Sequence, residues 1–171
     1  MELPFNFMKN SLCSSCRLPK ATLECELCHA LQCKKCVQIL KKDSFGFLKS
    51  IPENLTHRHY CGSCFDEKVG PELISYENTM ERAKNIMVFF RTQSEETRLI
   101  RRIEKPIKVT DCNDRDETIL RLAFFTAEAN YNALVDVVVT SEKVRNEGYQ
   151  KTKWQGVGVP VQLDGKKYKN D

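Results

Sequence analysis

From residue 13 to residue 64 the sequence is CSSCRLPKATLECELCHALQCKKCVQILKKDSFGFLKSIPENLTHRHYCGSC. It contains four CxxC pairs, at residues 13–16, 25–28, 33–36 and 61–64. Two thiolates three positions apart can turn onto one side of a tight loop, and two such loops supply the four corners of a tetrahedral zinc site. Thiolate is a soft ligand, which favours zinc over calcium or magnesium. We therefore expect these eight cysteines to bind two Zn2+ ions as structural ligands.

Four pairs can combine into two sites in three ways. Adjacent pairing would give two successive sites along the chain. A cross-brace would instead interleave them, with Cys13, Cys16, Cys33 and Cys36 on one ion and Cys25, Cys28, Cys61 and Cys64 on the other. Only four residues separate the second pair from the third, and this short gap favours neighbouring but distinct sites. His57 and His59 are weaker ligand candidates, because eight cysteines already complete two shells.

The order of the pairs resembles the FYVE family of zinc fingers over about residues 11–66. Phe65 and the acidic residues Asp66 and Glu67 follow the last pair, as in that family. The resemblance implies a cross-brace with two interleaved zinc ions and, in many members, binding of phosphatidylinositol 3-phosphate on endosomal membranes. RING fingers, by contrast, mix Cys and His in the middle of the ligand series, where this sequence has only His29 beside Cys28.

The lipid-binding motif of the FYVE family is absent from this sequence. The family has a basic run, R-[RK]-H-H-C-R, around its third cysteine, and the matching residues here are ATLECE at positions 21–26. Glu24 and Glu26 would repel a phosphate rather than bind it. The later arginine of the family is replaced by His59. Related fingers that lack the motif bind proteins, for example small GTPases, and flanking helices make the contacts.

Composition and charge exclude several classes of protein. The chain has 171 residues, of which 41% are hydrophobic and 29% charged, so wholesale disorder is not expected. Its apolar runs are far shorter than the roughly 18 residues of a membrane span, and residues 1–10 do not resemble a signal peptide. We therefore expect a soluble cytoplasmic protein. The formal charge of +4 falls to near zero once eight thiolates and two zinc ions are counted, so nucleic acid is not an expected partner.

The rest of the chain predicts a second, α+β domain. Gly70-Pro71 marks the expected boundary, giving a finger at 1–70 and a helix plus α+β domain at 71–171. A connecting helix is expected after Pro71, then a strand near residues 86–92 and extended chain toward Val109. A helix at 114–130 follows, capped by Asp114 with Glu117 and stopped by Asn130. Two more strands are expected at 134–140 and 153–163, the last broken at Gly156 and Gly158.

Residues from about 117 to 163 resemble the YbjQ-like family of small bacterial domains. The match lies in Asn130-Tyr131-Asn132-Ala133, a turn that leads into an apolar strand, and in a closing strand with Gly156 and Gly158. The resemblance implies an α+β fold that often assembles into rings, and hence a homo-oligomer through this domain. It implies no established chemistry.

No motif in the sequence indicates catalysis: there is no P-loop, dinucleotide turn, HExxH or nucleophile elbow. We therefore predict a non-enzymatic interaction or adaptor protein with a protein partner. One alternative is a membrane or phosphoinositide reader, whose candidate contacts are Lys34, Lys35 and Arg58. A second alternative is a RING-like ubiquitin ligase, which the order of the ligands disfavours. Cys112, the ninth cysteine, is expected to be a partly buried thiol.

Overall fold

The structure is a computed structural model, which describes residues 11–93, 95–146 and 148–164. The chain divides into two compact units, Met1–Tyr76 and Glu77–Asp171. The division lies within helix α2 (Gly70–Lys84), and each unit is described by itself. The described residues contain no helix with the length and apolar character that crossing a bilayer requires.

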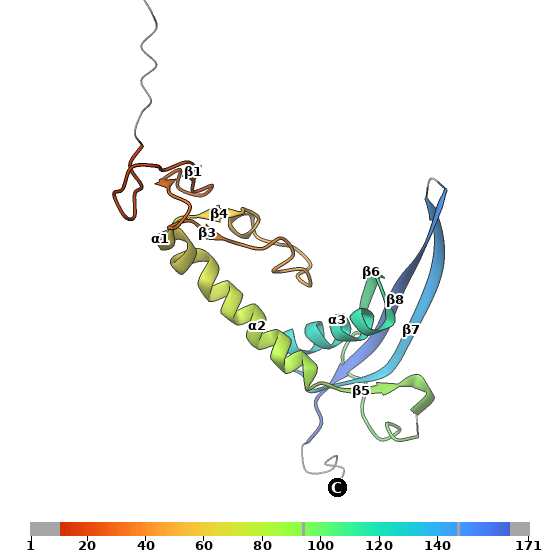
Figure 1. The fold of residues 1–171 in the computed structure, drawn as a ribbon. Coiled ribbons are helices and arrows are strands. Elements are labelled where there is room, and N and C mark those ends of the chain that lie inside the picture. Colours follow the sequence, from red (N-terminus) through yellow and green to blue (C-terminus); the bar gives the residue numbers. More distant parts are fainter. Residues whose placement is uncertain (1–10, 94, 147, 165–171) are drawn as a thin grey trace, which may run out of the picture. The chain divides into compact units, whose positions relative to one another are not determined.

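The first unit contains little regular structure besides its helices. Strand β1 pairs with β2 and strand β3 with β4, both antiparallel, and each strand has two residues. Strands β1, β3 and β4 are labelled in Figure 1. A 3-10 turn, η1, precedes β4. The bounds are β1 Leu23–Glu24, β2 Leu31–Gln32, β3 Gln38–Ile39, η1 Glu53–Leu55 and β4 His59–Tyr60.

A small apolar cluster forms the core of this unit. Its buried members are Cys25, Leu40, Phe45, Leu55, Tyr60, Cys61 and Val69. Two of these seven are cysteines of the CxxC pairs, so the core and the cysteine groups are one packed assembly. A core of this size gives limited stability, since domains of this length bury a smaller fraction of the unfolded chain's surface than larger domains do. Bound metal would therefore contribute much of the folding free energy of the unit.

Gly70-Pro71, the boundary expected from the sequence, lies within continuous helical structure. Helical structure runs without interruption through α1 (Gly62–Cys64), the π-helical segment η2 (Phe65–Val69) and α2. Proline has no N–H and cannot bond the carbonyl of the preceding turn. The π-helical segment ends at Val69, and the Gly70 N–H bonds the Phe65 carbonyl just before Pro71.

The second unit is a four-stranded sheet with a helix, which confirms the predicted α+β character. The strand order is β5-β7-β8-β6; β5 and β7 are parallel and the other pairs antiparallel (Figure 1). A 3-10 turn, η3 (Arg91–Gln93), follows β5. The remaining bounds are β5 Met87–Phe90, β6 Ile107–Cys112, α3 Arg115–Glu128, β7 Ala133–Asn146 and β8 Tyr149–Val161.

Helix α3 begins and ends as its sequence predicted. The Asp114 side chain accepts a hydrogen bond from the Glu117 N–H at 2.7 Å, which caps the helix. Asn130, just beyond the last turn, has a φ of 63°, the left-handed conformation that asparagine tolerates. The helix buries Leu122, Phe124 and other apolar side chains.

Gly156 and Gly158 do not break the last strand, which corrects the sequence-based expectation. Both lie inside β8, where they allow close packing. A Cβ at Gly156 would lie 2.7 Å from Thr118 Cγ2 of α3, and a Cβ at Gly158 2.9 Å from Leu134 Cγ. The hairpin is also longer than expected, because β7 ends at Asn146 and β8 begins at Tyr149.

An arginine network fastens the loop after η3 to the sheet. The Arg102 guanidinium donates to both carboxylate oxygens of Asp136, at 2.7 and 3.0 Å, and to the carbonyl of the buried Thr97 at 2.7 Å. Asp136 lies at a bulge in β7, with a φ of 54°. The hydrogen bond from Arg102 holds the pKa of Asp136 below its usual range.

Candidate metal centres

The eight cysteines of the CxxC pairs form two groups. Within each group the four sulfur atoms all lie within 4.8 Å of one another. The first and third pairs form one group and the second and fourth pairs the other, which is the interleaved arrangement. The groups are Cys13, Cys16, Cys33 and Cys36, and Cys25, Cys28, Cys61 and Cys64.

Tight turns bring the two sulfurs of a pair together. In the first pair the Arg17 N–H bonds the Cys13 carbonyl at 2.9 Å, and in the second the His29 N–H bonds the Cys25 carbonyl at 2.8 Å. Arg17 and His29 both have a left-handed φ, of 60° and 62°. Left-handed backbone is unfavourable for these residue types, so the turn persists because the surrounding structure demands it. The fourth pair instead uses a helical turn, with Cys61 as N-cap of α1.

The distances between pairs fit a tetrahedral metal. Cys16 Sγ lies 3.8 Å from Cys33 Sγ, and Cys28 Sγ lies 3.6 Å from Cys61 Sγ. Zinc–sulfur bonds of about 2.3 Å in a tetrahedron place neighbouring sulfurs about 3.8 Å apart. Each of these two distances joins cysteines of different pairs, and it is therefore a property of the fold rather than of one loop.

The electrostatics of the first group also favour a cation. Backbone hydrogen bonds from Cys16 and Cys33 lower the pKa of the Cys13 thiol to about 6; the Cys33 N–H lies 3.3 Å from the Cys13 sulfur. Cys36 is affected in the opposite direction, because hydrogen bonds with the Cys33 and Cys16 side chains raise its pKa to about 12. Four crowded thiols cannot all ionise by themselves, so full deprotonation requires a divalent cation among them.

The second group has the same character. Burial acts to raise the pKa of the Cys25 thiol, but backbone hydrogen bonds from Cys28 and Cys61 outweigh it and lower the value to about 6. Burial and hydrogen bonds with Cys61 and Cys28 raise the pKa of Cys64. Each group can thus hold one zinc ion. Four sulfur donors fill a tetrahedral shell, which is the arrangement of structural rather than catalytic zinc.

The histidines near these groups contact carboxylates and belong to neither group. His59 Nδ1 lies 2.8 Å from Glu26 Oε1, and His57 Nδ1 lies 3.6 Å from Glu26 Oε2. The Arg58 N–H donates to the same carboxylate at 3.2 Å. His29 likewise contacts Glu24 at 2.6 Å. Glu26 and His59 are thus bonded to each other, a contact between residues 33 positions apart that no local sequence pattern could reveal.

The structure does not bring the three candidate lipid contacts into one site. Lys34 and Lys35 are exposed beside a hollow that Leu18 and Pro19 also line. Arg58 is exposed at a different hollow of the same unit. The lysines and the arginine therefore do not converge on a single phosphate.

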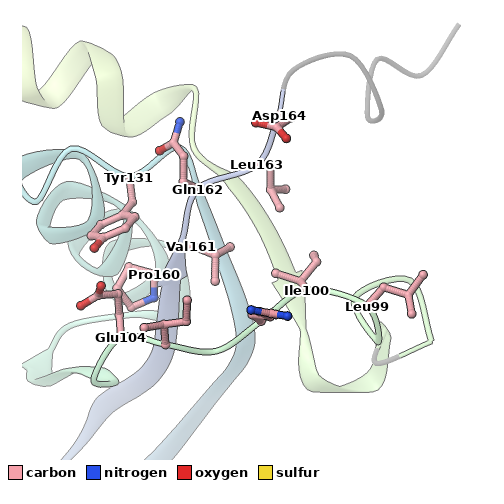
Figure 2. Close-up of a pocket in the computed structure, with 11 residues that line it drawn as sticks. Leu99, Ile100, Glu104, Tyr131, Pro160, Val161, Gln162, Leu163 and Asp164 are labelled. Atoms are coloured by element: carbon pink, nitrogen blue, oxygen red, sulfur yellow. The ribbon is translucent and has the colours of Figure 1, made fainter.

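A separate hollow of about 350 Å³ lies in the second unit. Figure 2 shows Leu99 and Ile100 on the loop that follows β5, with Val161 at the end of β8 and Leu163 just beyond it. Tyr131 also lines it, and a hydrogen bond to Glu104 raises the pKa of its hydroxyl. The lining residues include neither cysteine nor histidine, and the groups that could hold a metal among the described residues are the two cysteine groups.

Comparisons with known proteins identify no relative: no family model, no curated protein and no solved structure matches the chain.

Proposed function

We propose that the chain is a zinc-binding, non-enzymatic interaction or adaptor protein whose N-terminal unit is a FYVE-like cross-brace finger. The interleaved cysteine groups support this assignment, because each uses alternate CxxC pairs. Zinc shapes the finger in this proposal, and a protein partner binds to its surface. A reducing compartment such as the cytoplasm suits it, because the eight thiols must stay reduced to bind metal.

The observation that carries the proposal is the hydrogen bond between Glu26 and His59. These are two positions at which the FYVE resemblance assigns phosphate contacts. In this chain they bond each other at 2.8 Å, and the Glu26 carboxylate also accepts the Arg58 N–H. A phosphate would meet a carboxylate there, so lipid binding of the usual kind is disfavoured.

The test compares three activities of the zinc-loaded chain. Vesicles that contain each phosphoinositide in turn are sedimented with the protein, and discharge of ubiquitin from a loaded conjugating enzyme is followed in parallel. We expect neither vesicle binding nor discharge. Proteins captured from cells would then be purified, and calorimetry should show direct binding. Selective sedimentation with one phosphoinositide, or catalysed discharge, would overturn the adaptor assignment.

The YbjQ-like character of residues 117–163, and the homo-oligomer that it implies, stay predictions. Sedimentation equilibrium of the full chain tests them. A ring would give a mass several times that of the 19.8 kDa chain, and a monomer would remove this part of the proposal.

A further inference from the structure

A hollow of about 730 Å³ lies on the first unit. It is distinct from the hollow that Lys34 and Lys35 line beside the first cysteine group. Residues 39–46 form one part of it, and Ile51 with residues 55–58 forms the other. We name it the Lys41 hollow. Neither cysteine group contributes a residue to its lining, so its occupant would not compete with a bound metal.

The floor of the Lys41 hollow is apolar and fixed. Leu40, Phe45 and Leu55 line it, and all three belong to the buried core of the unit. Ile39 and Ile51 also line the hollow and are 54% and 41% exposed. Exposed isoleucines beside a concave apolar floor give a seat in which an apolar side chain loses contact with water.

Positive charge surrounds this seat. Lys41, Lys42 and Arg58 line the hollow, are exposed, and form no ion pair with any residue that the structure describes. The lining includes a single carboxylate, Asp43. The charge of the mouth is therefore positive, and carboxylates from a partner would find unpaired cations there.

We propose that the Lys41 hollow binds an acidic segment of a partner protein. An apolar side chain of that segment occupies the seat, and flanking carboxylates pair with the three cations. This inference rests on the adaptor function proposed above and names the chemistry of the partner. A membrane is the poorer match, since membrane-binding loops project apolar side chains outward. Phe45, the aromatic residue of this loop that lines the hollow, is only 2% exposed.

The test uses a random peptide library displayed on phage, selected against the zinc-loaded full chain. We expect enriched peptides in which Asp or Glu flanks an apolar residue. The double variant Lys41→Glu/Lys42→Glu should bind these peptides about tenfold more weakly, because two exposed contacts change from attraction to repulsion. Binding should also weaken as salt is raised. Ile51→Ser tests the apolar seat in the same assay.

The matched control is Lys34→Glu/Lys35→Glu, which makes the same change of charge at the other hollow. It should change affinity by less than about twofold. All four lysines are exposed, so folding should survive, and the zinc content of each variant checks this.

Three results would overturn the assignment of the hollow: no enrichment, enriched peptides without acidic residues, or equal losses in both double variants. If only Lys34→Glu/Lys35→Glu weakened peptide binding, the Lys41 hollow would not be the binding site, but the proposed adaptor function would stand. Binding of anionic vesicles that is lost in Lys41→Glu/Lys42→Glu would instead overturn both proposals.

Discussion

Removal of one cysteine sulfur should weaken zinc binding at one of the two sites and leave the other site intact. Cys16 is exposed, so Cys16→Ser leaves no cavity in the core and acts on metal binding alone. Its sulfur lies 3.8 Å from that of Cys33, across the gap between the first and third pairs. Structural zinc sites bind with an apparent free energy of about 10–16 kcal/mol, or about 3 kcal/mol for each of four thiolates. We therefore expect the affinity of this one site to fall by about a hundredfold.

A chromophoric chelator in competition measures the affinity, and alkylation followed by peptide mass spectrometry shows which cysteines react. In Cys16→Ser, fast alkylation should appear at Cys33 and Cys36, while Cys61 and Cys64 stay protected. The control is Cys112→Ser, a buried thiol of the second unit, which should leave both zinc affinities unchanged. Fast alkylation of the second CxxC pair with a protected third pair would refute the interleaved arrangement.

Three further perturbations test other parts of the account. Chelation of zinc should unfold the first unit and leave the second folded, and two-dimensional NMR would show this; loss of all dispersed signals would contradict it. Gly156→Ala places a methyl group against Thr118 and Leu122, so urea unfolding should show a loss of about 1–3 kcal/mol, and unchanged stability would mean that α3 packs more loosely than described. Because Arg102 depresses the pKa of Asp136, this pair stabilises above the unfolded Asp pKa of about 3.9 and ceases to do so as pH falls through the lower folded value. Arg102→Met should therefore lower the urea midpoint at neutral pH. Near pH 3 the difference in midpoint between variant and wild type should become smaller; a difference that does not change with pH would exclude this role of the pair.

Local features were predictable where a short pattern contains its own partner. The CxxC pairs predicted metal ligands because both sulfurs of a loop come from one turn. The cap of α3 was equally predictable, since Asp114 and Glu117 are three residues apart and bond directly. The nearly continuous run of Val and Leu from Leu134 likewise predicted a strand buried on both faces, and the first residues of β7 are fully buried.

Features that depend on distant neighbours were not predictable. Gly156 suggested a break in a strand, whereas its role is to admit α3, whose Thr118 lies far away in the sequence. The outer part of the β7–β8 hairpin is polar and exposed, so no hydrophobic alternation marked it. Glu26 suggested only repulsion of phosphate, and its bond to His59 arises from the fold. Local patterns contain no information about such pairings.

The central claim is that the first unit holds two zinc ions in two separate four-cysteine sites. The most direct measurement is the zinc content of the purified full chain, reconstituted with excess zinc and desalted, by elemental analysis and by mass spectrometry under native conditions. We expect two ions per chain, and both should be lost on chelation. One ion per chain, or none, would contradict it.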